Sequence, residues 1–395
     1  MTENIEVIVI GGGYAGVMAA NRLSRRDDVR VTVVNPRPHF VARIRLHQLV
    51  GGSDDAVVDY ATVLTERARL VVDSVAWIDA AERRVVLTTG GALPYDHLVY
   101  AVGSGSDVRG VPGAAEYALP LATLEEAERL RAALAAEPAA APVTVVGGGP
   151  LGIEAAAELA ELGRTVTLVC GDELGPDLHP RGRQSVARRL SGLGVVVLDG
   201  AGAAVTAVTR DSVRLRDGRD LPSTVTVWAA GFGVPDLAAR SGLTTDSLGR
   251  LLTDETLTSV DDERIVAAGD AAAPSDLPYR MSCQGAVQLG PYAADTVLSR
   301  IEGKQPAPVA LGFVSECISL GRRDAVFQST RLDDTARGFH ITGQLAAWLK
   351  ELICTGTVKQ LGLEARRPGL LRYPSWTRDH RRRQVLAGRE TPAAG

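Results

Sequence analysis

A glycine pattern that occurs twice constrains the fold of this chain more than any other feature. Residues 5–16 read IEVIVIGGGYAG, and residues 143–152 read VTVVGGGPLG. In both stretches an apolar run typical of a buried parallel strand leads into G-x-G-x-x-G and then into a helix. The first glycine permits a tight turn, the second lets backbone approach a pyrophosphate, and the third lets the helix pack against the strand. Because free N–H groups at a helix N-terminus bind anions, each stretch predicts a dinucleotide site.

The segments downstream of the two glycine motifs also repeat. Residues 85–103 read VVLTTGGALPYDHLVYAVG and residues 213–231 read VRLRDGRDLPSTVTVWAAG, and they align without a gap. Gly103 then matches Gly231. One unit, a βαβ motif, a β-hairpin and a strand ending in glycine, therefore occurs twice. This argues against the alternative that the motifs are merely glycine-rich structural turns.

Composition sets the broad class of the protein. A chain of 395 residues has room for two or three domains, and 45% hydrophobic with 23% charged residues is typical of a soluble protein. A net charge of −4 gives no basic field for nucleic acid. We expect no signal peptide, because the first apolar run is itself a strand, and no apolar run reaches the ~18 residues of a spanning helix.

The four cysteines, Cys170, Cys283, Cys317 and Cys354, are too far apart to form a C-x-x-C pair. The spacing therefore argues against a redox dithiol of near neighbours and against a zinc finger, and we expect no metal site. A reducing cytoplasm is the expected compartment.

The rest of the chain carries weaker signals. A short strand within residues 263–273 ends at Gly269-Asp270, where a carboxylate can accept hydrogen bonds from sugar or ribityl hydroxyls, although Gly-Asp alone is more often a turn. Residues 310–327 suggest an antiparallel sheet. An apolar stripe at helical spacing follows, and we favour a core-facing or dimer-facing helix over contact with a membrane surface. The stripe comprises Ile341, Leu345, Trp348, Leu349, Leu352 and Ile353. The Arg-rich stretch 378–383 reads as a solvated tail, with anionic lipid or a partner as the alternative.

Together with these motifs, YDHLVYAVGS (residues 95–104), VWAAGFG (227–233) and IVAAGDAA (265–272) give the chain a family resemblance. It resembles the flavoproteins with two dinucleotide-binding domains. More narrowly, it is similar to type II NADH:quinone oxidoreductases and to their relatives of the apoptosis-inducing-factor and ferroptosis-suppressor type. The resemblance covers nearly all of residues 5–330.

The resemblance implies an α/β fold with two Rossmann-like, three-layer domains and a C-terminal α+β segment. We expect an FAD-binding domain in two parts, residues 1–115 and 256–305, around an NAD(P)H-binding domain at 116–255. Residues 306–395 would close the flavin site and provide an interface, to a membrane or to a second copy. A peripheral position at the inner face of the membrane and a homodimer both stay open.

The stretch CQGAVQLG, residues 283–290, is the most discriminating part of the resemblance. Quinone-reducing members carry A-Q-x-A-x-Q-x-G here, which implies that Gln284 and Gln288 line the acceptor pocket. Amides suit this role because they donate to a quinone carbonyl without adding charge. The alternative is a helix start with two surface glutamines.

Two further residues in the resemblance are candidates for chemistry. Cys283 replaces the first alanine of the pattern; it fills an alanine-sized space, forms a flavin adduct, or handles sulfur chemistry with Cys317 as a second thiol. Glu154, two residues after Gly152, is implied to approach the junction of nicotinamide and flavin, whereas a helix-face glutamate is ordinarily solvated.

The chain departs from the family pattern at the residue that follows each second strand. In the first unit Asn35 stands where an acidic residue is expected, and an amide can still bind the adenosine ribose without charge. In the second unit the position is Cys170, which leaves NADH against NADPH open, because Arg181 and Arg183 lie too far along the chain to decide it.

The resemblance predicts an FAD-dependent NAD(P)H oxidoreductase that passes hydride to the flavin and then two electrons to a quinone-like acceptor. Alternatives are a tailoring oxidoreductase, a ferredoxin-type reductase and a redox-sensing flavoprotein. The candidate catalytic residues are Glu154, Cys283, Gln284 and Gln288. The residues expected to bind the two cofactors are Gly11, Gly13, Tyr14, Ala15, Gly16, Asn35, Arg43, Val75, Gly103, Gly147, Gly149, Gly152, Cys170, Gly231, Gly269, Asp270 and Gln284.

Overall fold

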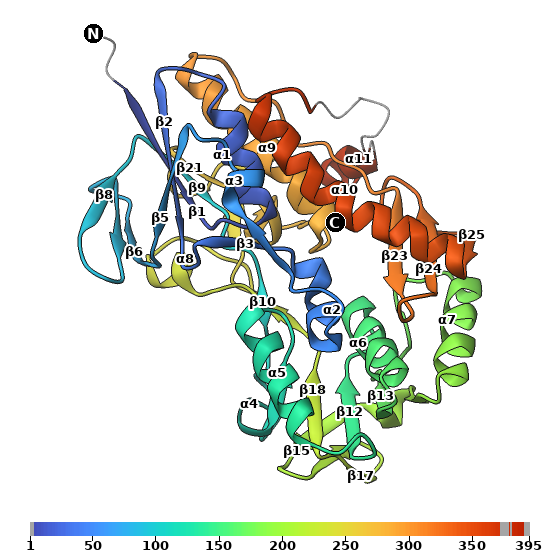
Figure 1. Cartoon of the computed structure of the whole chain (residues 1–395). Helices are drawn as coiled ribbons and strands as arrows, with labels where there is room; N and C mark the ends of the chain where they lie inside the picture. The colour runs from blue at the N-terminus through green and yellow to red at the C-terminus, as the bar shows by residue number, and fades with distance from the viewer. Residues whose placement is uncertain (1–3, 372–378, 380, 391–395) are drawn as a thin grey trace, which may run out of the picture.

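Two five-stranded parallel sheets organise the chain (Figure 1). The computed structural model describes residues 4–371, 379 and 381–390. The first sheet has the strand order β21-β9-β1-β2-β5 and the second has the order β11-β18-β12-β13-β14. The strands of the first sheet are β21 (Ile265–Ala267), β9 (His97–Tyr100), β1 (Ile5–Ile10), β2 (Val29–Asn35) and β5 (Ala68–Val72). Those of the second are β11 (Ala118–Pro120), β18 (Val225–Trp228), β12 (Pro142–Val146), β13 (Thr165–Val169) and β14 (Val196–Leu198).

The two sheets have matching registers at their centres. Ile10 of β1 is paired with Val34 of β2, and Val146 of β12 is paired with Val169 of β13. Each central strand leads through a glycine turn into a helix, α1 (Tyr14–Leu23) or α6 (Pro150–Glu161). The expected α/β class with two Rossmann-like units is confirmed.

The repeated hairpins form two three-stranded antiparallel sheets. They are β6 (Val75–Asp79), β7 (Arg84–Leu87) and β8 (Ala92–Pro94), and β15 (Val205–Val208), β16 (Ser212–Leu215) and β17 (Asp220–Pro222). Gly103 and Gly231 both have positive φ, +71° and +73°, which favours glycine. The strands that follow them, β10 (Gly105–Ser106) and β19 (Phe232–Gly233), pair with each other and so join the two units.

The first unit is completed by residues from far down the chain. Ile265 of β21 is paired with Leu98 of β9, and helix α9 (Cys283–Ile301) packs on α1. The close packing needs Gly290, because a Cβ there would lie 2.3 Å from the carbonyl oxygen of Ala15. The domain boundaries stated above stay a prediction.

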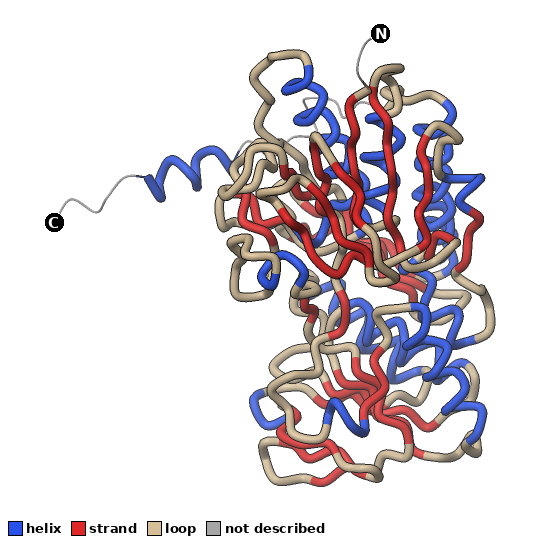
Figure 2. The backbone as a smooth tube through the Cα atoms, turned by 90° about the vertical axis from the view of Figure 1, so that its left-hand side faces the viewer, coloured by secondary structure: helices blue, strands red, loops and turns tan. Residues whose placement is uncertain are grey.

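The C-terminal segment lies across both units. It contains β23 (Ser315–Ser319), β24 (Ala325–Thr330) and β25 (Ala336–Thr342) in an antiparallel sheet, helix α10 (Gln344–Arg366) and helix α11 (Arg381–Glu390). Helix α10 contacts α1 and the sheet (Figure 1). Figure 2 shows the two parallel sheets in separate lobes, with helices beside each. The expected antiparallel sheet is present, although Ile341 belongs to β25 and not to the helix.

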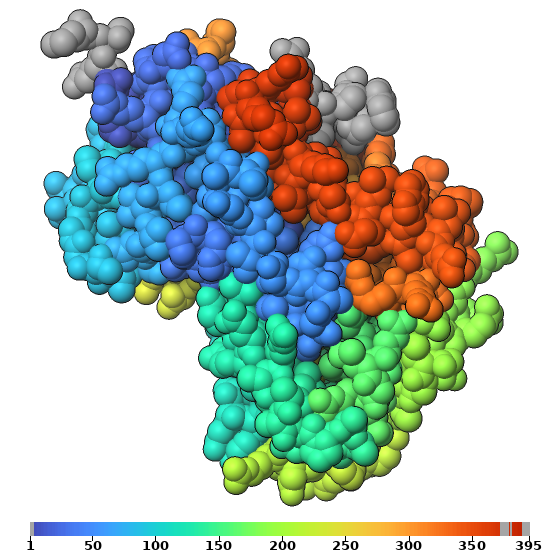
Figure 3. Space-filling model, viewed as in Figure 1, coloured from blue at the N-terminus to red at the C-terminus, as the bar shows by residue number. Residues whose placement is uncertain are grey.

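The apolar stripe on α10 does not face the core. Leu345, Trp348 and Leu352 are 57%, 60% and 54% exposed, and Figure 3 shows α10 on the surface of the face that it draws. The core-facing interpretation is therefore wrong, because the opposite side of the helix, with Ala346 and Cys354, packs inward. No helix in the described ranges combines the length and apolar character needed to cross a bilayer. Arg378 and residue 380 of the Arg-rich tail lie outside the described residues. The solvated-tail interpretation is wrong for Arg382, which is 6% exposed and ion-paired with Glu255 over 2.8 Å.

The remaining elements connect these layers. They are β3 (His39–Val41), η1 (Arg43–Arg45), α2 (Leu46–Gly51), β4 (Val57–Asp59), α3 (Tyr60–Val63), α4 (Ala114–Tyr117), α5 (Leu124–Ala136), α7 (Pro180–Gly192), η2 (Ala201–Ala203), α8 (Leu237–Arg240), β20 (Leu251–Thr253), η3 (Gly269–Ala271) and β22 (Ala272–Pro274).

Candidate functional site

The first glycine turn is held in a shape that only glycine permits. A Cβ on Gly11 would lie 2.2 Å from the carbonyl oxygen of Ala101, and one on Gly16 would lie 1.8 Å from the carbonyl oxygen of Gly11. A Cβ on Gly13 would meet nothing within 4 Å. The first and third glycines therefore serve packing, while the second leaves room beside the N-terminus of α1 for an anionic group.

The second glycine turn repeats this arrangement. A Cβ on Gly147 would lie 2.6 Å from the carbonyl oxygen of Ala229, one on Gly152 would lie 1.9 Å from that of Gly147, and one on Gly149 would meet nothing within 4 Å. Both turns thus fit a pyrophosphate at their second glycine, and the α6 turn adds Pro150 at the first helical position.

Asn35 is bound to the first turn itself. Its Oδ1 accepts from the Gly12 N–H over 3.0 Å and its Nδ2 donates to the Arg37 carbonyl over 2.9 Å. The hydroxyl of Tyr60 donates to the Gly12 carbonyl over 2.8 Å. Asn35 therefore stabilises the turn, and its contact with a ribose stays a prediction.

A polar cluster surrounds Asp270, in the part of the first unit that comes from late in the chain. Ser104 Oγ donates to Asp270 Oδ2 over 2.7 Å, and Arg43 Nη1 lies 3.7 Å from the same oxygen. Gly269, at φ +71°, packs against Ala15, to which an added Cβ would come within 2.9 Å. Distant segments that contain predicted FAD ligands thus meet beside the first glycine turn.

Two other predicted cofactor residues are buried beside this turn. Tyr14 stands edge-on to Phe40, with ring centroids 5.0 Å apart, and burial raises the pKa of its phenol, with Cys283 adding to the effect. Val75 belongs to an apolar cluster with Ile10, the last residue of β1, and Val34, the residue before the end of β2. Their contacts with a cofactor stay predictions.

Glu154 is buried in a network of charges. Its Oε1 accepts from Lys350 Nζ over 2.7 Å and from the Ser319 N–H over 3.0 Å, and its Oε2 lies 3.5 Å from His47 Nδ1. Burial opposes ionisation of Glu154, but the charge of Lys350 and the hydrogen bonds from Lys350 and the Ser319 N–H outweigh it and lower its pKa. Lys350 keeps its charge, since Glu154 raises its pKa against the effect of burial. Glu154 is therefore not a solvated surface residue.

His47 completes the network in its neutral form. It is 1% exposed, and burial lowers its pKa to about 4. A neutral imidazole donates from one nitrogen only, so donation from Nδ1 to Glu154 would leave Nε2 as an acceptor. In the described part of the chain Nε2 is buried without a hydrogen-bond partner.

Both predicted acceptor glutamines face the segment that leads into β23. Gln288 is 5% exposed and its Nε2 donates to the carbonyls of Gln284, 3.1 Å away, and Gly312, 3.4 Å away. In the amide orientation that satisfies both of its atoms, Gln284 donates to the Ser315 carbonyl and accepts from the Val314 N–H, each over 3.2 Å. Gln288 is thus not a surface glutamine, and the role of both at an acceptor stays a prediction.

The adenosine end of the second unit carries acidic rather than basic groups. Asp199 follows β14 and adds to the effect of burial, which raises the pKa of Cys170 to about 12. Arg183, which the sequence placed too far along the chain to decide the cofactor preference, is ion-paired with Glu173 and donates to the Leu178 carbonyl over 3.2 Å. Which nucleotide binds at this place stays a prediction.

The comparisons with known proteins agree with this geometry. Residues 5–294 match the family described as pyridine nucleotide-disulphide oxidoreductase. The chain belongs to this family. A Mycobacterium tuberculosis protein named as NADH dehydrogenase-like is 32% identical over 351 residues, which cover 81% of this chain and 87% of that protein. The type II NADH:quinone oxidoreductase Ndh of the same species is 29% identical over 346 residues, which cover 76% of this chain and 74% of that protein.

The fold comparison extends further along the chain. The structure of NDH2 from Plasmodium falciparum in complex with NADH superposes with a TM-score of 0.76 at 14% identity, covering 94% of this chain and 99% of that one. The resemblance to type II NADH:quinone oxidoreductases is confirmed, and the chain is an oxidoreductase of the pyridine nucleotide-disulphide family.

The cysteines of this family member are free, although the family name refers to a disulphide. Burial raises the pKa of Cys283 to about 11 and that of Cys317 to about 12, so both are neutral thiols near pH 7. Cys354, on α10, is close enough to add to both shifts. Sequence reasoning considered Cys317 as the partner of Cys283 and missed Cys354, because helix α10 brings it in from the end of the chain.

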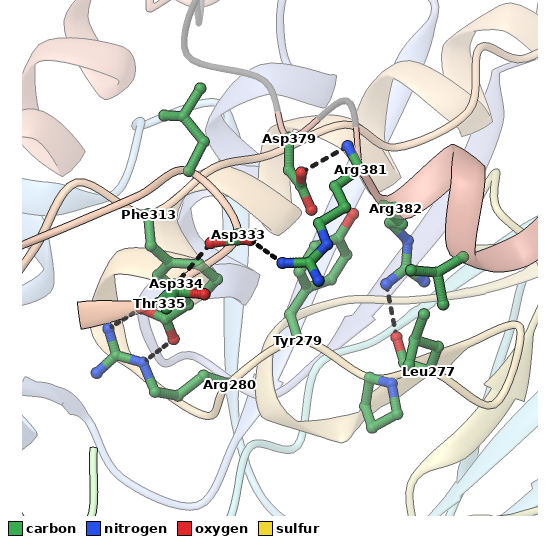
Figure 4. A pocket seen from close by; sticks show the side chains of 13 residues that line it. Leu277, Tyr279, Arg280, Phe313, Asp333, Asp334, Thr335, Asp379, Arg381 and Arg382 are labelled. Atoms are coloured by element: carbon green, nitrogen blue, oxygen red, sulfur yellow. Dashed lines mark hydrogen bonds and ion pairs between the residues drawn. The ribbon is translucent and has the colours of Figure 1, made fainter. Parts of the chain in front are cut away.

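The protein also has a cavity of about 360 Å³ just before the start of α9. The sequence did not predict this cavity. Figure 4 shows its charged groups paired: Arg280 with Asp334, and Arg381 with Asp333. The guanidinium of Arg280 stacks over Phe313, 5.0 Å from the ring centroid. Phe313 adjoins Gly285, so this cavity lies next to the segment that the two glutamines contact.

His47 and Lys350 are the functional candidates that sequence reasoning missed. Neither residue belongs to a motif. A possible signal is that the chain has very few lysines, at 304, 350 and 359. In the described residues, no group of three or more His, Cys, Asp or Glu side chains is arranged to hold a metal ion.

Proposed function

We propose that the chain is an FAD-dependent oxidoreductase that takes hydride from NADH and delivers two electrons to a quinone. The observation that carries the proposal is the duplicated turn, in which Gly13 and Gly149 both leave open space beside a helix N-terminus. An enzyme that transfers hydride from a nicotinamide to a flavin must bind two dinucleotides, and the two turns would provide one site for each. The relative named type II NADH:quinone oxidoreductase supports the acceptor class.

The residues around the first turn fit FAD. Its pyrophosphate would lie at Gly13, and Asp270, which Ser104 and Arg43 hold in place, would accept bonds from flavin hydroxyls. Bound FAD supplies a carrier that accepts a hydride and passes on two electrons. The second turn would hold NADH, and the acidic groups near Cys170 argue for NADH over NADPH.

Lys350, held in place by Glu154, would stabilise the negative charge that develops on the acceptor. Lys350 Nζ has three N–H groups, and two of them reach Glu154 Oε1 and the Cys317 carbonyl, over 2.7 and 2.9 Å. We propose that the third donates to a substrate oxygen. Because the ammonium is already fixed by Glu154, little reorganisation is needed as charge appears on that oxygen.

Gln284 and Gln288 would position the acceptor from the other side. Their amides already bind the backbone of residues 312–315, which lies next to Phe313 and the cavity of Figure 4. A neutral amide can bind a quinone carbonyl without competing with Lys350 for charge.

The exposed side of α10 suits contact with a membrane, where long-chain quinones dissolve. Leu345, Trp348 and Leu352 lie at i, i+3 and i+7, and Phe339 of β25 is 62% exposed. A row of large apolar side chains on one helix face is typical of an interface. We therefore propose peripheral contact with a lipid surface, with a second copy of the chain as the competing occupant.

The test measures the two half-reactions separately. Purified protein should be yellow, NADH should bleach its visible flavin band, and a menaquinone analogue should restore the band. Gln284→Ala and Gln288→Ala should slow reoxidation by the quinone and leave bleaching unchanged. A colourless protein that rebinds no FAD would end the proposal.

The same measurements separate the alternatives. Rapid reoxidation by a ferredoxin or a small electrophile, with none by quinones, would indicate a ferredoxin-type reductase or a tailoring enzyme. A long-lived complex with NAD and slow reoxidation by every acceptor would indicate a redox-sensing flavoprotein.

A further inference from the structure

The turn between β23 and β24 lies against helices α6 and α7 of the second unit (Figure 1). The N–H of Arg322 donates to Glu161 Oε2, at the end of α6, over 2.6 Å. Arg189 of α7 donates from Nε to the Leu320 carbonyl over 3.3 Å and from Nη2 to Glu161 Oε1 over 3.0 Å. Gly321 has φ +91°, and an added Cβ there would come within 2.1 Å of Glu161 Cδ. The turn therefore needs a glycine to fit against α6.

Asp324 connects the same turn to the start of α10. Its Oδ1 accepts from the N–H of Gly343 over 2.8 Å. Gly343 is the N-cap residue of α10 and has no side chain to cap the helix, so a carboxylate from another segment binds this N–H, where the helix dipole favours negative charge. Asp324 Oδ2 lies 3.4 Å from Arg189 Nε. We call Glu161, Arg189 and Asp324 the latch, because together they join α6 and α7 to α10.

The latch lies as far from the ion pair of Lys350 and Glu154 along one helix as along the other. Glu154 and Glu161 of α6 are seven positions apart, and so are Gly343 and Lys350 of α10, which is about two turns in each helix. The Ser319 N–H, which donates to Glu154 Oε1 over 3.0 Å, belongs to the chain segment that then reaches the latch. Helices α6 and α10 are thus linked at two levels.

Different contacts hold α10 on the first unit. Glu351 Oε2 accepts from Arg45 Nη1 of η1 over 3.2 Å, and the buried Glu364 accepts from Arg22 Nε of α1 over 2.6 Å. These pairs fix the middle and the end of α10, whereas the latch fixes its start on the second unit. Because α6 belongs to the second unit, the separation of its carboxylate from the ammonium on α10 depends on contacts of the latch kind.

We propose that the latch is a positioning device that holds the Lys350 ammonium at the acceptor site by fixing α10 on the second unit. This inference rests on the proposed function, in which Lys350 donates to a substrate oxygen. A charged donor lowers a barrier most when it is already in place as charge develops, and a displacement of about 1 Å can cost much of the rate. Glu161, Arg189 and Asp324 act through Lys350 and are positioning residues.

The test compares Arg189→Gln with Arg189→Lys and with two control variants. Arg188→Gln changes an exposed arginine on the same helix, and Arg250→Gln breaks an ion pair with Asp246, 2.7 Å long, in the turn before β20. Arg189→Gln should bleach with NADH at the normal rate, while its limiting rate of reoxidation by quinone falls roughly 10-fold. The quinone concentration that gives half of that rate should change less. Arg189→Lys should recover part of the rate, because lysine keeps the charge but not the guanidinium fork.

Both controls should reoxidise like the unchanged protein. Unaltered reoxidation in Arg189→Gln, equal slowing of both half-reactions, or equal slowing in Arg250→Gln would overturn the proposal. If Arg189→Gln does not fold, Asp324→Asn makes the same prediction, because its amide oxygen can still accept from the Gly343 N–H while the charge that faces Arg189 is lost.

A second measurement does not depend on turnover. Lys350 is 12% exposed and Lys304 is 71% exposed, so acetic anhydride should modify Lys350 much more slowly, as mass spectrometry of the modified protein can resolve. Arg189→Gln should accelerate modification of Lys350 and leave that of Lys304 unchanged. No acceleration, or the same acceleration in Arg250→Gln, would overturn the proposal. Failure of the unchanged protein to bleach with NADH or to reoxidise with any quinone would instead reject the proposed function.

Discussion

Lys350 Nζ donates to Glu154 Oε1 over 2.7 Å, across 196 positions of sequence. The contact joins the C-terminal helix α10 to the helix that follows the second glycine turn. Both side chains are nearly buried, at 12% and 8% exposed, so each charge depends on the other. The C-terminal segment therefore contributes to the centre of the candidate site and does not merely cover it.

We expect Lys350→Ala to destabilise the protein strongly. It would leave Glu154 ionised and buried without its main partner, and removal of one member of a buried pair costs about 3–5 kcal/mol. Chemical unfolding measures the difference. Lys304→Ala removes a surface ammonium that is 71% exposed and should change the unfolding free energy little. Equal effects of the two substitutions would show that the buried pair is not formed.

We expect the stability of the protein to fall as pH drops from about 6.5 to about 4 because of His47. Burial lowers its folded pKa to about 4, below the unfolded value of 6.5, so the unfolded chain takes up a proton in this window and the folded chain does not. The full loss is on the order of 3 kcal/mol. Unfolding experiments on the unchanged protein and on His47→Gln between pH 7 and pH 4 measure it.

Other carboxyl groups also titrate in this range. Because the unchanged protein and His47→Gln both contain them, their contribution cancels when the two unfolding free energies are subtracted. The His47→Gln protein should show the smaller pH dependence. Parallel curves would mean that His47 has the same pKa in the folded and unfolded chains.

We expect substitutions at two glycines of the second turn to have different effects, one on stability and the other on NADH binding. Gly152→Ala places a methyl group 1.9 Å from the Gly147 carbonyl oxygen and should lower the thermal midpoint sharply. Gly149→Ala meets nothing within 4 Å and should keep the midpoint but weaken NADH binding. Gly356→Ala on α10 also has open space and, as a helical position, should gain up to ~1 kcal/mol. Calorimetry and NADH titration test all three, and normal NADH binding by Gly149→Ala would contradict a pyrophosphate at that turn.

We expect NADH to be preferred to NADPH, with Asp199 contributing. Its carboxylate adjoins Cys170, where the 2′-substituent of the ribose would lie, and repels a phosphate. Asp199→Asn should improve binding of NADP⁺ and leave that of NAD⁺ nearly unchanged. Titration calorimetry with both nucleotides measures this, and Asp211→Asn, at a distant hairpin, serves as the control. An unchanged ratio in Asp199→Asn would remove Asp199 from cofactor selection.

We expect the exposed face of α10 to bind lipid. Trp348→Asp combined with Leu352→Asp should abolish sedimentation with anionic vesicles and leave bleaching by NADH intact, because both side chains point outward. Val260→Asp, at an exposed apolar residue elsewhere, is the control. If the unchanged protein ignores vesicles and the double variant converts a dimer to a monomer, the face binds a second copy instead.

Local rules were sufficient to predict the duplicated units. Strands, glycine turns and hairpins depend on periodicity and on φ angles within a few residues, so the strand before each glycine turn was predicted and Gly103 was matched with Gly231. The burial of Gln288 and the cluster around Asp270 also involve residues singled out from motifs.

What the sequence by itself determined is thus the α/β class, the two glycine turns and the family to which they point. Only the tertiary structure decided that His47 and Lys350 contact Glu154, that Cys354 joins the other thiols, and that the stripe on α10 faces outward. The physical reason is that burial and ion pairing arise between segments far apart in the chain. A helical period shows that a helix has two faces, but only packing determines which face is covered.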